Sequence, residues 1–325
     1  MPEGALKQAL SAMSFGVALR DINVDQQTLG KDRPPDADSL KNSIAAFYHN
    51  NTLEGLTEFW NWGFYEPGLQ REITQTLGGF DEFLSDGYSE QLYFYTLKQV
   101  PRTNGSGRRI LEVGCGRGIG LHFLSRIERE SEFVGLDLAG GAVSRANEQY
   151  SRRGSLRYVQ GDAEKLPFGD AEFDAVINVE SSHNYPNLRG FISEVARVLR
   201  PNGYFSHVDV FTDDRLQCMN QCKRDSASEL KWLAETEITG RVKDAIRRRM
   251  APGSLFRQQL AHGYRFVPWP MSAAVVNFGM YGYGKSFADP GNATWSRLLP
   301  WRRNRLNMAR TFKSYWHTLA QKPAR

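Results

Sequence analysis

The stretch Ile110-Leu-Glu-Val-Gly-Cys-Gly-Arg-Gly118 decides the fold of this 325-residue chain, because an apolar run breaks there into alternating glycines. Ile110–Val113 predicts a short buried strand, in which only Glu112 is acidic. The glycines let the backbone turn tightly and come close to a ligand. Apolar residues between Leu121 and Leu124 predict the start of a helix. A strand, a glycine loop and a helix in this order are typical of a Rossmann-like α/β sheet.

The spacing of these glycines does not match a dinucleotide-binding loop. That loop follows G-x-G-x-x-G, and Ile119 stands where the third glycine would be. The chain instead has G-x-G-x-G after a strand that carries an acidic residue near its end. A non-catalytic domain with coincidental glycines is the alternative interpretation, but it does not explain why acidic residues also end the later strands.

Further strand motifs follow the glycine loop in a regular order. Phe133–Asp137 predicts a second strand that ends in a carboxylate, where an acid can accept the ribose hydroxyls of a nucleoside. Tyr158–Glu164 contains the end of a third strand, and Phe173–Asn178 predicts a fourth. Val195–Phe205 predicts a helix, a Pro-Gly turn and a fifth strand.

This series of motifs resembles the class I S-adenosylmethionine-dependent methyltransferases. The resemblance implies an α/β Rossmann-like fold with a mostly parallel seven-stranded sheet flanked by helices, and S-adenosyl-L-methionine as the cofactor. It also implies that Asp137 binds the ribose, that Asp162 accepts from the adenine amino group, and that the following N–H donates to the ring. The predicted cofactor-binding residues are Glu112, Gly114, Cys115, Gly116, Asp137, Leu138, Asp162, Ala163 and Asn178.

A narrower resemblance concerns the mycobacterial phthiotriolone and phenolphthiotriolone dimycocerosate O-methyltransferases. It rests on Ile177–Pro186, Phe191–Phe205, Asn61–Glu66 and Glu235–Thr239. It implies methylation of a hydroxyl on a bulky, mostly apolar natural product or lipid-like molecule. The first 40 residues and the stretch Ala251–Arg310 have no clear counterpart in that group, so the identity of the acceptor stays open.

The segment after the fourth strand is where catalytic residues are expected, because ligands of such sheets bind beyond the carboxyl ends of the strands. DNA and some amine methyltransferases have an Asn/Asp-Pro-Pro-aromatic motif here. This chain has Asn178-Val-Glu-Ser181 instead, which argues against a nucleobase acceptor. His183 is the candidate general base, because a neutral imidazole is suited to take a proton near neutral pH. Asp209 is the candidate partner that holds the imidazolium.

Other roles for this segment stay open. His183 can equally cap the loop or line a pocket while proximity alone carries the reaction, and His207 is interpreted as a structural strand residue. Glu180 is the third catalytic candidate. It matters most in the alternative that the protein is a C-methyltransferase of the sterol or tocopherol kind. A further alternative is a protein that binds the cofactor and transfers no methyl group. No metal site is predicted, because no cluster with ligand spacing lies near this segment.

Composition limits the partners and the compartment. The net charge of +5 is concentrated in Arg247–Arg249 and Arg302–Arg305, which are compatible with peripheral contact to an anionic membrane, although a solvated helix face is the simpler interpretation. No apolar run is long enough to span a membrane. Three cysteines cannot all pair, and Cys115 lies in the glycine loop, which fits a reducing, cytoplasmic location. We expect a hydrophobic small-molecule acceptor and no nucleic-acid partner; a homodimer is one option for the oligomeric state.

The chain divides into four predicted segments. Residues 1–40 are a mobile or weakly packed arm, 41–104 a helical cap, 105–250 the Rossmann-like core, and 251–325 loops and helices on the substrate side. Leu230–Glu235 predicts a sixth strand, and Ile238–Met250 an amphipathic helix. Met271–Tyr283 is expected to supply apolar walls. Thr311–Leu319 predicts the last strand, antiparallel at the edge of the sheet.

Overall fold

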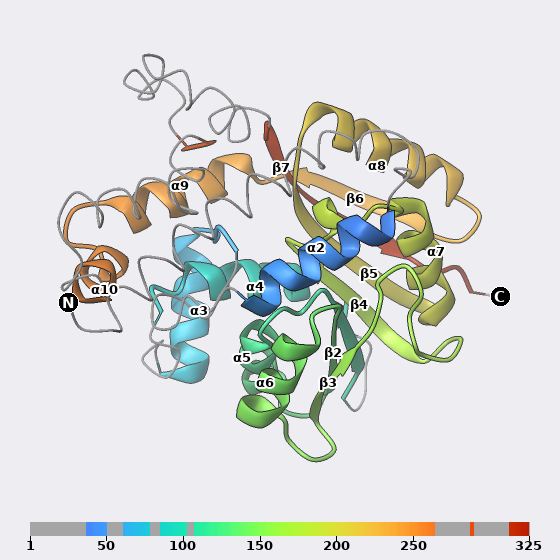
Figure 1. Ribbon diagram of the computed structural model, residues 1–325, viewed down its shortest axis with the longest axis horizontal. Helices are drawn as coiled ribbons and strands as arrows, with labels where there is room; N and C mark the ends of the chain where they lie inside the picture. Colours follow the sequence, from blue (N-terminus) through green and yellow to red (C-terminus); the bar gives the residue numbers. More distant parts are fainter. Residues whose placement is uncertain are drawn as a thin grey trace.

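A computed structural model describes residues 37–50, 61–78, 85–102, 107–263, 287–288 and 312–324. Its centre is a seven-stranded sheet of order β3-β2-β1-β4-β5-β7-β6 (Figure 1). The strands are β1 (Arg109–Val113), β2 (Glu132–Asp137), β3 (Leu156–Gln160), β4 (Phe173–Val179), β5 (Leu199–Phe211), β6 (Lys231–Glu237) and β7 (Ser314–Gln321). All the strands predicted from the sequence are therefore present.

Strands β1 to β5 run parallel to one another, and β7 runs antiparallel to both β5 and β6. This arrangement confirms the predicted mostly parallel sheet. The prediction that the last strand forms the edge was wrong. Tyr204 on β5 pairs with Gln321 on β7, and Lys231 on β6 pairs with the same residue from the other side, so β6 is the edge strand.

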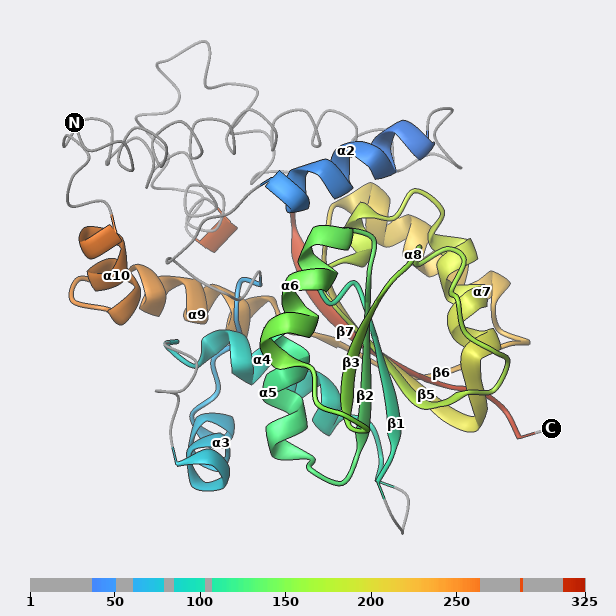
Figure 2. The same cartoon turned by 60° about the horizontal axis from the view of Figure 1, so that its bottom comes forward.

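Helices cover both faces of the sheet (Figures 1 and 2). On one face lie α4 (Tyr88–Lys98), α5 (Ile119–Ile127) and α6 (Gly140–Tyr150), and on the other lie α7 (Leu188–Val198) and α8 (Asp213–Asp225). The remaining elements are α2 (Ala37–Asn50), α3 (Pro67–Leu77), α9 (Thr239–Met250), α10 (Leu255–Gly263) and the short 3-10 helix η2 (Ser182–Asn184). The sandwich of helix, sheet and helix is the architecture that the glycine loop predicts.

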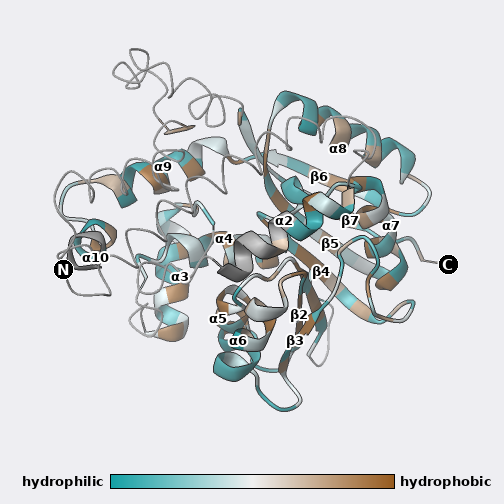
Figure 3. Cartoon of the chain, viewed as in Figure 1, coloured by the Kyte–Doolittle hydropathy of each residue, from teal (hydrophilic) through white to brown (hydrophobic). Residues whose placement is uncertain are grey.

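Each face of the sheet has its own apolar core. One cluster joins α4, α5 and α6 to side chains such as Ile110 and Ile177, and the other joins α7 and α8 to side chains such as Leu111 and Val176. Successive residues of β1 and β4 point to opposite faces, and the apolar residues of both strands are buried on both sides of the sheet. Figure 3 shows the central strands mostly in the hydrophobic colour, whereas much of α8 is hydrophilic.

The predicted segments correspond only partly to the structure. Helix α2 begins at Ala37, inside the predicted arm 1–40, and the buried side chains of Ala37 and Leu40 show that this part of the arm is packed. Residues 1–36, the predicted apolar walls Met271–Tyr283 and the basic cluster Arg302–Arg305 lie outside the described residues. Within the part of the chain that the structure describes, no helix is long and apolar enough to cross a membrane.

Candidate active site

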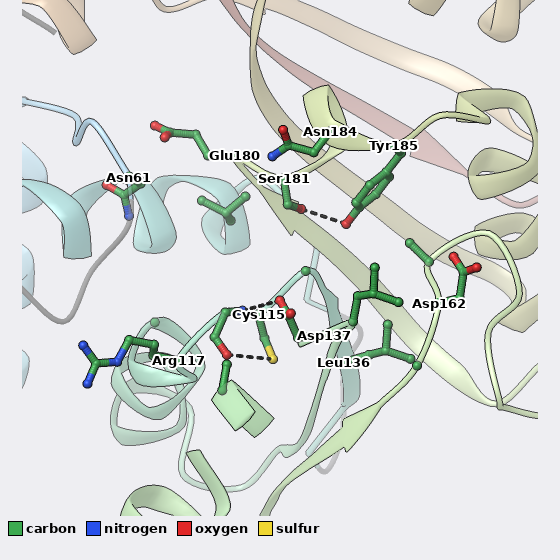
Figure 4. A pocket seen from close by; sticks show the side chains of 18 of the residues that line it. Asn61, Cys115, Arg117, Leu136, Asp137, Asp162, Glu180, Ser181, Asn184 and Tyr185 are labelled. Atoms are coloured by element: carbon green, nitrogen blue, oxygen red, sulfur yellow. Dashed lines mark hydrogen bonds between the residues drawn. The ribbon is translucent and has the colours of Figure 1, made fainter. Parts of the chain in front are cut away.

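A pocket opens at the carboxyl ends of β1, β2 and β4, where a Rossmann-like sheet binds its ligands (Figure 4). It encloses about 1040 Å³ counted out to its open mouth. The glycine loop, the ends of β2 and β4, and the loop after β3 line it. The pocket is also lined by Lys41 of α2, by Asn61, which lies before α3, and by Tyr93 of α4. The described residues thus bring the predicted motifs together around one cavity.

The glycine loop leaves space that side chains would fill. Gly114 and Gly118 have φ angles of 78° and 82°, which residues with a Cβ rarely adopt. A Cβ on Gly114 would lie 2.2 Å from the Ser181 Oγ. A Cβ on Gly116 would meet nothing within 4 Å and would extend into the pocket. The loop therefore keeps the pocket open, as a bound ligand requires.

Asp137 lies at the end of β2 with its carboxylate held by the backbone. The N–H of Gly116 donates to Oδ2 at 2.8 Å, and the N–H of Ala139 donates to Oδ1 at 2.9 Å. Burial raises the pKa of Asp137, and these donors offset part of the rise. Each carboxylate oxygen has a second lone pair, so the group can still accept from two hydroxyls. This geometry fits the ribose of the expected adenosyl cofactor.

The loop after β3 forms the other end of the pocket. Asp162, Ala163 and Glu164 line it, and the Asp162 Oδ1 accepts from the N–H of Glu164 at 2.9 Å. The Asp162 Oδ2 accepts from the Nζ of Lys41 at 2.7 Å. Together with Asp137 and the glycine loop, this end gives the acceptors and the open cradle that an adenosyl group needs, so the residues present fit S-adenosylmethionine.

Two predicted cofactor-binding residues lie behind the pocket. Glu112 is fully buried, and burial raises its pKa to about 8, while the hydroxyl of Tyr93 lowers it in part. Asn178 is also fully buried and donates from Nδ2 to the Val113 O at 2.7 Å and to the Ser181 Oγ at 2.7 Å. Neither residue is among those that line the cavity. Instead, Glu112 supports Tyr93 and Asn178 supports Ser181, and both of these residues line the cavity.

His183 and Asp209 form a close pair beside the pocket. The Nδ1 of His183 lies 2.7 Å from the Asp209 Oδ1, and the N–H of His183 donates to Oδ2 at 2.8 Å. Burial lowers the pKa of His183, but the charge and hydrogen bond of Asp209 outweigh it, so the pKa is raised. Although burial acts to raise the pKa of Asp209, His183 lowers it to about 2. Asp209 therefore stays ionised.

The Nε2 side of the His183 ring, opposite Asp209, faces polar and aromatic groups. Nε2 lies 3.0 Å from the Nδ2 of Asn184, a residue that lines the pocket, whereas His183 itself is not among the lining residues. The ring also contacts Phe312 edge-on, with centroids 6.3 Å apart. Trp62 packs against Phe312 at 5.9 Å and against Phe287 at 4.9 Å. His183 thus lies between the pocket and this aromatic group.

Glu180 lines the pocket directly, on a strained backbone. Its φ of 48° is in the left-handed region, which non-glycine residues occupy mainly where the surrounding structure fixes them. The N–H of Trp62 donates to its Oε1 at 2.7 Å, and the hydroxyl of Tyr315 donates to the same oxygen. Burial raises the pKa of Glu180 to about 7. A carboxyl with such a pKa can take up or release a proton near neutral pH.

Sequence reasoning missed several residues of the site. Arg215 of α8 is buried and donates from Nη2 to the carbonyl oxygens of Ser182 and Tyr185 at 2.6 and 2.7 Å, which fixes the loop around His183. Its charge also acts to lower the pKa of His183. Further missed lining residues are Lys41, Asn61, Tyr93, Arg117, Ser181 and Tyr185. Arg117, Ser181, Tyr185 and Asn61 lie within motifs that the sequence shows, but nothing in those motifs assigns them to the pocket. No local motif marks Lys41, Tyr93 or Arg215, because contacts between distant segments create their roles.

His207 has the structural position that its sequence context indicates. It is fully buried on β5, its Nε2 lies 2.8 Å from the Ser182 Oγ, and burial lowers its pKa to about 4. It is therefore neutral at ordinary pH. The Ser182 hydroxyl donates to the Asp209 Oδ2 at 2.6 Å, so His207 supports the Asp209 carboxylate from behind.

Known proteins resemble the chain over the same region. A family model described as "Methyltransferase domain" matches residues 111–207. A fatty-acid O-methyltransferase of Mycolicibacterium smegmatis is 44% identical over 152 residues, which are 46% of this chain and 52% of that protein. The chain thus matches about half the length of that relative. A phthiotriol/phenolphthiotriol dimycocerosates methyltransferase of Mycobacterium ulcerans is 33% identical over 71% of this chain and 84% of the relative.

A solved structure agrees at the level of the fold. Geranyl diphosphate C-methyltransferase from Streptomyces coelicolor superposes with a TM-score of 0.55 at 14% identity, covering 89% of this chain and 100% of that one. The fold, the glycine loop and the two acidic strand ends define a cofactor-binding Rossmann-like protein. With the match across most of the Mycobacterium ulcerans relative, the chain belongs to the class I S-adenosylmethionine-dependent methyltransferase family.

Proposed function

We propose that this protein is an S-adenosylmethionine-dependent O-methyltransferase that acts on a hydroxyl of a bulky, mostly apolar, lipid-like acceptor. The His183–Asp209 pair beside the pocket carries this proposal, because it supplies a general base with a fixed counter-charge. The aromatic side chains of Trp62, Phe287 and Phe312 next to His183 favour an apolar acceptor. Two relatives, a fatty-acid O-methyltransferase and a phthiotriol/phenolphthiotriol dimycocerosates methyltransferase, support a lipid-like acceptor.

The cofactor, when bound, supplies a methyl group on a sulfonium, which an acceptor oxygen can attack in line. The chain's own residues do the rest. Asp137 and Asp162 orient the adenosyl part, and the glycine loop leaves room for it. The acceptor hydroxyl replaces the Asn184 amide at the Nε2 of His183 and gives its proton to that nitrogen. The Asp209 Oδ1 then holds the imidazolium through Nδ1.

A second candidate function is carbon methylation with Glu180 as the base. The observation that favours it is the position of Glu180 itself, since this carboxyl lines the pocket and His183 does not. Both donors to Glu180 act on Oε1, so Oε2 is the oxygen that would receive a proton from a carbon acceptor. The two candidates differ in the proton-accepting residue and in the atom that is methylated.

The deciding experiment is product analysis with methyl-labelled cofactor. The protein is incubated with a long-chain alcohol, a long-chain phenol, a long-chain fatty acid and an isoprenoid alkene, and the products are identified by mass spectrometry. Label on the alcohol or phenol oxygen supports the proposal. Label only on the fatty-acid carboxylate would contradict a hydroxyl acceptor while keeping the lipid-like class, and label only on carbon would contradict O-methylation. His183→Ala should reduce turnover by about 10²–10⁴-fold with Glu180→Gln less affected, and the reverse pattern assigns the base to Glu180.

A further inference from the structure

Helix α2 lies outside the Rossmann-like core, and it contacts helix α6 of that core. In Figures 1 and 2 it lies beside one end of α6, next to the ends of the central strands. Ala37 and Leu40 anchor its first turn with buried side chains. Lys41, the next residue, lines the pocket together with Asp162, Ala163 and Glu164. A side chain of α2 therefore belongs to the end of the pocket that fits the adenine.

Lys41 bridges two carboxylates at this end. Its Nζ donates to the Asp162 Oδ2 at 2.7 Å and to the Glu164 Oε2 at 2.6 Å. The side chains of Lys41 and Glu164 are 16% and 8% exposed, so solvent and salt screen this half of the bridge little, whereas the Asp162 side chain is 34% exposed. Burial lowers the pKa of Lys41, but the two carboxylates outweigh it and raise the pKa. Lys41 is therefore a cation held by two anions.

Glu164 extends the connection to the loop around His183. Its Oε1 accepts from the N–H of Asn187 at 2.6 Å. The Asn187 side chain in turn accepts from the N–H of Gly190 at 2.9 Å and caps helix α7, directly after that loop. Lys41 thus joins α2 to the adenine end of the pocket and, through Glu164, to the segment that precedes α7.

We propose that Lys41 is a cofactor-retention residue, which holds α2 over the adenine end of the pocket through its bridge to Asp162 and Glu164. The adenosyl cofactor and its demethylated product then exchange with solvent only when this bridge opens. The proposal depends on cofactor binding and not on the identity of the acceptor or of the base. It assigns a role in the cofactor site to a helix that is no part of the core.

The test measures the dissociation of S-adenosylhomocysteine. The radiolabelled compound is bound to the protein, chased with excess unlabelled compound, and the bound fraction is followed by rapid filtration. Lys41→Ala leaves two neighbouring carboxylates without a cation, so we expect dissociation to be faster by about tenfold. Lys41→Arg keeps the charge and should stay close to the parent protein. Lys98→Ala, which removes an exposed ion pair with Glu72, is the matched control and should change nothing.

Two outcomes would overturn the proposal. One is a dissociation rate of Lys41→Ala within about twofold of the parent rate. The other is a lower melting temperature of Lys41→Ala without faster dissociation, which would make the bridge purely structural. Hydrogen exchange gives an independent reading. S-adenosylhomocysteine should protect the backbone amides of α2 in the parent protein and in Lys98→Ala, and fail to do so in Lys41→Ala.

Discussion

Asp209 is the residue on which the charge state of the candidate site depends. Both of its oxygens accept from the His183 segment, and it is completely buried. A buried carboxylate is stable only with partners that compensate for its lost hydration. Here the His183 ring, the Ser182 hydroxyl and the backbone N–H groups of His183 and Val210 supply them. His183 and Asp209 therefore form one electrostatic unit, in which Asp209 raises the pKa of His183 and His183 lowers the pKa of Asp209.

The pH dependence of turnover tests this unit. A base must be neutral to accept a proton, so turnover should fall as the pH drops through the raised pKa of His183. Asp209→Asn removes the charge that raises this pKa, so the acidic limb should move to lower pH while the plateau falls as well. The measurement is kcat against pH from about 5 to 9. Asp170→Asn, at a largely exposed carboxylate, is the control. An unmoved limb would remove Asp209 from the mechanism.

The same pair contributes to stability within a limited pH range. The folded-state pKa of His183 is raised, so its contribution is complete below its unfolded value of about 6.5 and is lost as the pH rises through the folded value. The folded-state pKa of Asp209 is lowered, so its contribution is present above about 3.9 and is lost as the pH falls through about 2. The pair therefore stabilises the fold most strongly between roughly pH 4 and 6.5.

At the scale of elements, the glycine loop shows how closely the helices approach the sheet. The carbonyl of Gly118 accepts from the hydroxyl of Tyr158 at 2.7 Å, which ties the start of α5 to β3. A Cβ on Gly118 would lie 2.6 Å from the Tyr158 ring and 2.7 Å from the Ala146 Cβ. The close packing of α5, α6 and β3 therefore depends on the missing side chain.

Gly118→Ala and Gly154→Ala separate crowding from backbone strain. Both glycines have a φ of 82°, but a Cβ on Gly154 would meet nothing within 4 Å. Gly154→Ala should cost about 1–2 kcal/mol in the free energy of unfolding, from backbone strain alone. Gly118→Ala should cost about 1–3 kcal/mol more because of overpacking, and it should weaken cofactor binding. Urea unfolding and calorimetry measure both effects; equal losses in the two variants would contradict this account.

Local patterns in the sequence predict the strands well and their lateral order less well. Ile110–Val113 and Phe133–Asp137 are apolar on both faces, and a glycine or an acid marks where each ends, so their type and direction follow from local chemistry. The position of β7 depends on which strand edge it meets, and no residue within β7 specifies that. The order β5-β7-β6 was therefore not predicted.

In the candidate site, too, the sequence predicts the residues that local motifs mark and misses those that long-range contacts place there. Asp137 is recognisable because it ends a strand, and Asp162 and His183 because each closely follows one. Lys41 reaches Asp162 across 121 positions of sequence, and Arg215 reaches the carbonyl of Ser182 across 33. A lysine on a polar helix and an arginine in a helix's first turn look like ordinary surface residues until the fold places them. Roles that arise from long-range contact leave no local signal.

At the scale of the whole molecule, β7 connects the core to the candidate site. It pairs with β5 over eight residues and with β6 on its other side, and Tyr315 from β7 donates to Glu180 in the pocket. Without β7, the edge of β5 that carries Asp209 and His207 would be open, and their buried polar groups would meet water. The strand is therefore part of the site and of the core at once.

A variant that ends at Phe312 tests this connection. Removing β7 exposes the core surface that Tyr315 covers and leaves the backbone of β5 unpaired on one side. We therefore expect the protein to lose cooperative unfolding and to bind no S-adenosylhomocysteine. Circular dichroism during thermal unfolding and calorimetry with the product measure the two losses. Substituting Gln321→Ala, at the end of β7, is the mild control and should leave both nearly intact. Cooperative unfolding of the shortened chain would show that the sheet closes without β7.

The position of β7 in the sheet also predicts that this strand pairs late during folding. Tyr204 meets Gln321 across 117 positions, and β6 precedes its neighbour β7 in the chain by the whole of α9 and α10. Such distant pairing makes folding slow, because a long loop must close before the contact forms. Until then β5 is an exposed edge onto which another chain can add a strand. Because Tyr315 arrives with β7, we expect molecules in which β7 has not yet paired to lack the Tyr315–Glu180 contact and to expose the edge of β5.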